Sequence, residues 1–193
     1  FGFQFTQTGG TFNHNGGTAI FDSIHPAFSM AIGAAVPGQR AIFNNVIFNP
    51  LDGSIAFSGA TVFQVNGSLQ IVNGSLQGGN GLDARGDVTI GTSSDGGNMP
   101  ITFSGSANQA FTNNGGLNTT GIWTVNKPSG TVTGSTDMLL AANQTLNITS
   151  GTLYLADGSD LTVGPINVAA QGRLINDSSA TITLGGNVAN LGN

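Results

Sequence analysis

The sequence predicts an all-β protein built as a parallel β-helix, a β-solenoid with about 21 residues and three short strands in each coil. One apolar position recurs at every twenty-first place in the chain: Phe48, Leu69, Ile90, Phe111, Val132, Leu153 and Leu174. Gly, Asn, Ser and Asp, the residues of tight turns, separate the short apolar runs. Val-Asn-Gly also recurs at one third of this interval, at 65–67 and 72–74. We therefore expect three sides to each coil, and the ladder implies about seven coils.

The composition favours strands and argues against several functions. Only 7% of the 193 residues are charged, against about 25% in an ordinary globular domain, and none of the nine acidic residues is Glu. Strong helix formers are therefore scarce, whereas 38% hydrophobic residues suffice for a narrow core. A net charge of −5 with four basic residues argues against nucleic-acid binding. No apolar run approaches the roughly 20 residues of a membrane-spanning helix, so we expect no transmembrane segment.

Residues 1–40 are predicted to form an aromatic-rich cap and assembly segment. Phe1, Phe3 and Phe5 alternate with small or polar residues, which is the pattern of a strand with one apolar face. The ends of solenoids need covering, so this segment is expected to cover the first coil. The alternative is a strand that pairs with the open sheet edge of a neighbouring subunit.

One part of this cap, residues 24–36, has a helical pattern. Phe28, Ile32 and Val36 fall on one helical face, and Pro26 suits the first turn of a helix. We therefore expect a short capping helix there.

Residues 41–193 are predicted to form the solenoid itself. A second apolar ladder with the same spacing runs through Leu140, Leu161 and Ile182. Strands of successive coils lie about 4.8 Å apart, so each inward residue is expected to stack on its equivalent in the next coil.

The segment from Gly151 to Asn193 reads GTLYLADGSDLTVGPINVAAQGRLINDSSATITLGGNVANLGN. It resembles secreted bacterial β-solenoids: autotransporter passengers, filamentous-haemagglutinin-like adhesins and related cell-surface repeat proteins. The likeness covers residues 41–193, in repeat texture and composition. It implies a parallel β-helix with an extracellular structural or adhesive role. The start at Phe1 rather than Met, together with the Asn-, Thr- and Gly-rich composition, is interpreted as a sign of secretion.

Two patterns invite comparison with calcium sites. Residues 78–83, GGNGLD, begin like a calcium-binding nonapeptide, but Arg85 stands where that motif has an apolar residue, and only one copy is present. Asp137, Asp157 and Asp177 are evenly spaced, at every twentieth position, and are expected to stack in one corner, where calcium would relieve their repulsion. The plainer interpretation makes them turn residues that bind their own backbone. We expect no cofactor, with calcium at this corner as the alternative.

No arrangement of residues predicts an enzyme. Asp157 with Asp160, or Asp83 with Asp87, could meet the distance that paired carboxylates need for glycoside hydrolysis. However, the basic residues are scattered along the chain, and no Ser, His and Asp constellation is present. We expect a protein without catalytic residues.

The first of two functions that remain open is structural. It is a self-assembling extracellular protein, the subunit of a filament or surface layer, whose partners are copies of itself joined head to tail. The last residues show no charged cap of the kind that prevents edge-to-edge growth. The residues expected at the assembly interface are Phe1, Phe3, Phe5 and Leu191.

The second function is that of an adhesin or passenger module that binds a glycan or a host surface. Such a module needs an exposed aromatic or polar patch on one side of the solenoid. Trp123 and Tyr154, the single Trp and the single Tyr, are the candidates, although a single Trp on a strand is more often packed in the core.

Overall fold

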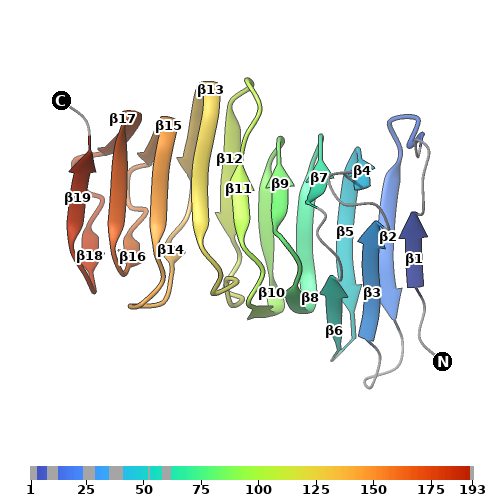
Figure 1. The fold of residues 1–193 in the computed structure, drawn as a ribbon. Coiled ribbons are helices and arrows are strands. Elements are labelled where there is room, and N and C mark those ends of the chain that lie inside the picture. The colour runs from blue at the N-terminus through green and yellow to red at the C-terminus, as the bar shows by residue number, and fades with distance from the viewer. Residues whose placement is uncertain are drawn as a thin grey trace.

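The structure is a computed structural model that describes residues 4–7, 13–23, 29–34, 41–51, 53–57 and 62–191. It is an all-β parallel β-solenoid of about 7 turns with about 21 residues per coil, which confirms the predicted fold class. The coils stack along one axis, with β1 near one end and β19 at the other (Figure 1). The described residues contain no helix, and hence no helix long and apolar enough to cross a membrane.

The strands within the described residues follow one another in short steps. They are β1 (Gln4–Gln7), β2 (Thr18–Ser23), β3 (Ser29–Ala34), β4 (Ala41–Phe43), β5 (Asn45–Pro50), β6 (Ser54–Phe57), β7 (Phe63–Val65), β8 (Leu69–Gly78), β9 (Leu82–Ala84), β10 (Val88–Gly97), β11 (Ile101–Phe103), β12 (Gln109–Asn113), β13 (Trp123–Gly134), β14 (Met138–Leu139), β15 (Leu146–Leu155), β16 (Leu161–Val163), β17 (Ile166–Asn176), β18 (Ile182–Leu184) and β19 (Val188–Leu191).

Three parallel ladders of strands make up the sides of the coil. Face A consists of β4, β7, β9, β11, the first halves of β13, β15 and β17, and β19. Face B consists of β2, β5, the first halves of β8 and β10, β12, and the second halves of β13, β15 and β17. Face C consists of β1, β3, β6 and the second halves of β8 and β10, followed further along the axis by a separate three-stranded sheet of β14, β16 and β18. Long strands such as β8 and β13 belong to two faces, and their register shifts where the chain turns the corner.

The first predicted apolar ladder lies inside the solenoid. Its fully buried members are Phe48, Leu69, Ile90, Phe111, Val132 and Leu153, and its partly buried member is Leu174. The predicted stacking is confirmed where Leu153 pairs with Val132 on one side and with Leu174 on the other.

On face B, earlier coils vary in length by an even number of residues. On face B, Val46 pairs with Leu69 and Leu69 pairs with Val88, so the first of these coils is longer than the second. Side chains alternate between the two faces of a strand, so an even change in length leaves the apolar side chains pointing inward. The sequence therefore predicted which residues are buried, but the stacking partners it predicted for these coils are wrong.

The second predicted ladder shows the same effect. Leu161 pairs with Ile182 as predicted, but its partner in the preceding coil is Met138 and not Leu140. Met138 and Leu140 are both buried, because they are two positions apart and point to the same side.

The predicted capping helix is wrong over residues 29–34. These residues form β3, which pairs in parallel with β1 on one side and with β6 on the other. Two strand neighbours satisfy the backbone groups of β3, and this tertiary pairing outweighs a weak local helical pattern that contains Gly33. The other residues of the expected helix lie outside the described residues. Before residue 41, β2 likewise pairs in parallel with β5.

Short acidic side chains link successive coils, which explains why Asp is used and Glu is not. The Oδ1 atom of Asp137 accepts a hydrogen bond of 3.0 Å from the backbone N of Asp160, and Asp160 in turn accepts one of 2.8 Å from Thr181 N. Asp87 accepts a bond of the same kind from Ala110 N at 2.8 Å. One methylene suffices to reach a neighbouring coil about 4.8 Å away, and a longer side chain would lose more rotamer entropy for the same bond.

Candidate functional site

A groove of about 530 Å³ lies on the outside of face A and crosses successive coils. Its lining residues are Val62, Asp83, Arg85, Thr102, Ser104, Gly105, Ser106, Asn126 and Pro128. We call it the Arg85 groove. Most of its lining side chains are hydroxyls, an amide and an ion pair, so it suits a polar ligand better than an apolar one.

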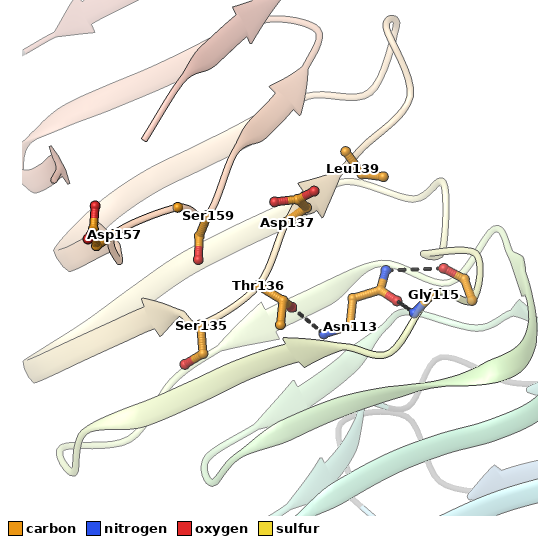
Figure 2. A pocket seen from close by; sticks show the side chains of 10 residues that line it. Asn113, Gly115, Ser135, Thr136, Asp137, Leu139, Asp157 and Ser159 are labelled. Carbon is orange, nitrogen blue, oxygen red and sulfur yellow. Dashed lines mark hydrogen bonds between the residues drawn. The ribbon is translucent and has the colours of Figure 1, made fainter. Parts of the chain in front are cut away.

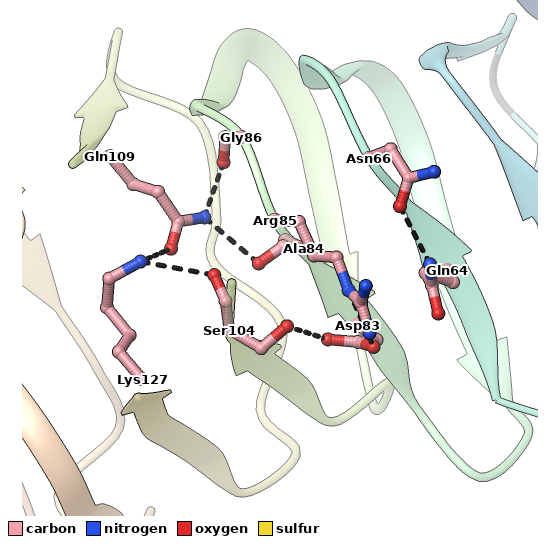
Figure 3. A network of polar contacts seen from close by, with 9 residues as sticks. All are labelled: Gln64, Asn66, Asp83, Ala84, Arg85, Gly86, Ser104, Gln109 and Lys127. Carbon is pink, nitrogen blue, oxygen red and sulfur yellow. Dashed lines mark hydrogen bonds and ion pairs between the residues drawn. The ribbon is translucent and has the colours of Figure 1, made fainter. Parts of the chain in front are cut away.

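Arg85 and Asp83 form the charged part of this groove (Figure 3). Arg85 Nε lies 3.5 Å from Asp83 Oδ2, and the two side chains are 40% and 8% exposed. The Oγ atom of Ser104 donates a hydrogen bond to Asp83 Oδ1. Arg85 Nε is buried, and no hydrogen bond from this guanidinium is found in the described part of the chain. Asp83 is therefore fixed from the next coil, while the guanidinium keeps donors to spare.

A second set of polar side chains lies inside the solenoid, behind the groove (Figure 3). Lys127 is 1% exposed, and its Nζ donates to Gln109 Oε1 and, at 3.1 Å, to the backbone O of Ser104. Gln109 in turn donates through Nε2 to the backbone O atoms of Ala84 at 2.9 Å and Gly86 at 2.7 Å. Burial lowers the pKa of Lys127 below its ordinary value. The amine is enclosed, so its role is to bind coils together and not to meet a ligand.

Gln144 repeats the arrangement of Gln109 further along the solenoid. Its Nε2 donates to the backbone O atoms of Thr119 at 2.9 Å and Gly121 at 2.6 Å, and its Oε1 accepts from Ala141 N at 3.1 Å. Both glutamines are buried and both hold two carbonyls of the preceding turn. They act as inward anchors for these turns by donating to their carbonyls, of which Ala84 O also accepts a bond of 2.8 Å from Ser104 N.

A second, smaller groove of about 380 Å³ lies where chain segments turn between faces B and C (Figure 2). Its lining residues are Asn113, Gly115, Gly116, Ser135, Thr136, Asp137, Leu139, Asp157, Gly158 and Ser159. Asp137 and Asp157 are both exposed here, but each already accepts a hydrogen bond, from Asp160 N and from Ser179 Oγ respectively.

The predicted corner of Asp137, Asp157 and Asp177 does not form a single row. Asp137 aligns with Asp160, and Asp177 accepts a bond of 2.7 Å from the hydroxyl of Tyr154. No group of three His, Cys, Asp or Glu side chains suited to a metal ion is found among the described residues. The even spacing of the three aspartates misleads here because the coils in this part of the chain are longer than that spacing.

Tyr154 and Asp177 form a hydrogen-bonded pair on the surface. The hydrogen bond from Tyr154 lowers the pKa of Asp177, with further help from the backbone N of Ser178. The same bond raises the pKa of Tyr154, together with desolvation and the nearby charges of Asp177 and Asp157. The pair joins two coils and holds Tyr154 against the surface.

Trp123, one of the two aromatic candidates for a binding surface, is fully buried. Its ring centroid lies 5.3 Å from that of Phe111 and 5.6 Å from that of Phe103, and its Nε1 donates to Thr119 Oγ1 at 3.0 Å. Trp123 is therefore part of the core and offers no surface to a ligand.

The GGNGLD segment forms a turn between β8 and β9. Gly78, Gly79 and Gly81 have positive φ angles, and Gly78 N donates to Asn98 Oδ1 at 2.7 Å. The carboxylate of Asp83 is engaged by Ser104 and Arg85. The segment therefore forms a glycine-rich turn.

The last described coil exposes apolar side chains. Leu184 is 42% exposed, Val188 is 54% exposed and Leu191 is 70% exposed. Leu191, expected at an assembly interface, is therefore accessible, whereas Phe1 and Phe3 lie outside the described residues. Phe5 lies in β1, where a strand was predicted.

No family model, curated protein or solved structure matches this chain.

Sequence reasoning did not single out Lys127, Gln109 or Gln144, and it treated Arg85 only as a misfit in a calcium motif. One signal was available. Lys127 is the single Lys of the chain, and it lies two and four positions after Val125 and Trp123, so in a strand its side chain points to the same side as these two apolar residues.

Proposed function

We propose that this chain is a self-assembling structural protein whose solenoids stack head to tail into a filament or surface layer outside the cell. The observation that supports this function is the exposure of the core's own axial row in the last described coil. Along face A, Trp123, Leu146 and Ile166 are successive partners with 0%, 0% and 1% exposure. The next member of the row, Val188, is 54% exposed.

Both ends of the described solenoid present strand edges on the same three faces. In the described residues, face A begins at β4 and ends at β19, face B begins at β2 and ends at β17, and face C begins at β1 and ends at β18. Each of these terminal strands pairs on one side only within its face. Because all the ladders are parallel, a second copy can add in the same direction on all three faces, a contact that repeats without closing.

Apolar burial would stabilise such a contact. Full burial of a Val or Leu side chain contributes about 1.5 to 3 kcal/mol. Leu184, Val188 and Leu191 would each gain part of that amount against a second copy. With 7% charged residues, the chain brings few charges that would have to be desolvated or would repel one another at the interface.

The extracellular setting rests on composition and on the resemblance to secreted solenoids. The aromatic segment at Phe1, Phe3 and Phe5 is proposed to reach the last coil of the next copy. Removal of residues 1–8 is then expected to abolish filaments. Filaments that persist would exclude this segment from the contact while leaving stacking through Val188 open.

The direct test is sedimentation velocity and negative-stain electron microscopy of the purified chain over a concentration series. We expect particles that lengthen with concentration in steps of one solenoid. Val188→Lys places an ammonium in the proposed contact and is expected to raise the concentration needed for assembly at least tenfold, because burial of an unpaired charge is costly.

The matched control is Leu117→Lys, because Leu117 is 65% exposed on the side of the solenoid. This variant is expected to assemble like the wild type. A wild-type chain that remains a monomer at every concentration, or two variants that weaken assembly equally, would refute end-to-end stacking.

A further inference from the structure

Beyond assembly, the Arg85 groove has the features of a ligand site. We propose that it binds an acidic saccharide, with a carboxylate of the ligand on the guanidinium of Arg85 and the sugar hydroxyls on the polar groups around it.

The guanidinium is the feature that can take a charged partner. Arg carries five N–H donors in a planar fork that matches a carboxylate. In the described part of the chain, its polar side-chain contact is the 3.5 Å ion pair from Nε to Asp83, which is too long for a hydrogen bond. With 40% of this side chain exposed in the groove, a bound carboxylate can supply the acceptors that the fork lacks.

Asp83 fixes the guanidinium without competing for the open side of the groove. Its side chain is 8% exposed and takes a hydrogen bond from Ser104, a residue of the next coil. Gly105, with a φ of 80°, turns the chain so closely past Arg85 that an added Cβ would lie 3.2 Å from Arg85 Cβ. The base of Arg85 is thus held on two sides, which limits the entropy lost when a ligand binds.

The rest of the lining suits a sugar. Thr102 and Ser106 supply hydroxyls, and Asn126 supplies an exposed amide whose Oδ1 accepts a bond of 2.9 Å from Ser150 Oγ. Its Nδ2 is a donor that can serve a ligand hydroxyl. Val62 and Pro128 supply apolar edges against which the C–H groups of a sugar ring can lie.

A single guanidinium and a few neutral hydrogen bonds imply weak binding. We expect a Kd of about 1 mM for a short ligand. A filament that repeats the groove along its length would bind a long polysaccharide more tightly through many weak contacts.

The test is a titration of the full chain with a trigalacturonate, compared with its fully methyl-esterified form, which keeps the hydroxyls but has no charge. Calorimetry gives the affinity, and the Nε–H signals in NMR show which arginine is engaged. We expect the Arg85 signal to shift with the acid and not with the ester, and we expect the affinity to fall as salt is added.

Two variants separate binding from folding. Arg85→Gln is expected to weaken binding at least tenfold, but it also removes the ion pair with the buried Asp83. Asn126→Asp avoids this problem, because an exposed aspartate still accepts the bond from Ser150 and adds a negative charge beside the groove. It is expected to weaken binding at least tenfold with unchanged thermal stability.

The control variant is Arg173→Gln, because Arg173 is an exposed arginine of β17 outside the groove. It should bind like the wild type. Equal binding of acid and ester would mean a neutral saccharide site and would overturn the carboxylate assignment. No shift of the Arg85 signal at about 10 mM ligand, ten times the expected Kd, or loss of binding in Arg173→Gln, would overturn the site itself. None of these results depends on whether the chain assembles.

Discussion

The buried amine of Lys127 gives a sharp test of how the coils are held together. Gln109→Met keeps the size of the side chain but removes its three hydrogen bonds, two to backbone carbonyls and one from Lys127 Nζ. Because Gln109 is 2% exposed, water does not replace the lost partners.

The magnitude follows from the groups that lose a partner. In Gln109→Met these are chiefly Gly86 O and the charged Lys127 Nζ, because Ala84 O keeps a bond of 2.8 Å from Ser104 N. Each buried carbonyl without a donor costs about 1 to 3 kcal/mol, and a charged group costs more. Gln144→Met is the matched control, since it removes three hydrogen bonds between neutral groups. We expect Gln144→Met to lower the free energy of unfolding by about 2 to 4 kcal/mol and Gln109→Met to lower it by about 1 to 2 kcal/mol more.

Urea unfolding followed by the fluorescence of Trp123 is a suitable assay, because Trp123 is the single Trp and lies in the core. Its dependence on pH adds a second readout. Burial lowers the pKa of Lys127 in the folded state, so between that pKa and the ordinary value of 10.5 the unfolded chain binds more protons, and stability rises with pH. Gln109→Met removes a hydrogen-bond acceptor from the charged form of Lys127. The loss of stability in this variant, relative to the wild type, should therefore become smaller as the pH rises towards the ordinary pKa of a lysine.

Two results would refute this reasoning. One is a Gln109→Met variant no less stable than Gln144→Met at neutral pH. The other is a loss of stability in Gln109→Met that stays constant or grows as the pH rises, which would mean that Gln109 does not stabilise the charged form of Lys127.

The remaining predictions concern the surface and the turns. Because the pKa of Asp177 is lowered, the stability that its carboxylate contributes is complete above the ordinary value of 3.8 and is lost as the pH falls through the lowered pKa. Because the pKa of Tyr154 is raised, the stability that its hydroxyl contributes is lost only as the pH rises above 10. Tyr154→Phe should therefore reduce both the acid and the alkaline loss of stability measured by thermal unfolding, and unchanged losses would contradict the pairing. Gly97 has a φ of 106°, and an added Cβ would lie 2.0 Å from the backbone O of Leu76, so Gly97→Ala should cost more than about 3 kcal/mol in urea unfolding. Gly158→Ala is the control, since Gly158 has a φ of 72° and nothing within 4 Å, and should cost about 1 to 2 kcal/mol; equal losses would mean that the close approach to Leu76 is unimportant.

Which side chains are buried could be read from the sequence, and how the coils align could not. Phe48 and Leu69 were both recognised as inward residues, yet Phe48 pairs with Ile71 and Leu69 pairs with Val46. Whether a side chain is buried depends on whether its position along the strand points inward or outward, and the alternation of apolar and polar residues in the sequence reveals this. Which residues of successive coils pair depends on the lengths of the turns between the strands. A turn that is longer by an even number of residues changes the pairing partners but leaves the same side chains pointing inward.

Local patterns also failed where a neighbouring strand decided the outcome. β3 lies within the segment 24–36 that has a helical pattern, but strands on either side complete its hydrogen bonds. The three aspartates are evenly spaced in the sequence, but Asp137 lies beside Asp160 because the coil between them is longer than that spacing.

The sequence alone determined the fold class, the mean length of the coil and the inward apolar rows, because all three follow from periodicity and from residues that favour strands and turns. The tertiary structure alone decided the register, the enclosure of Lys127 by Gln109 and the groove around Arg85. These features join residues from different coils, about one coil length apart in sequence, and their meeting depends on the lengths of the turns between them.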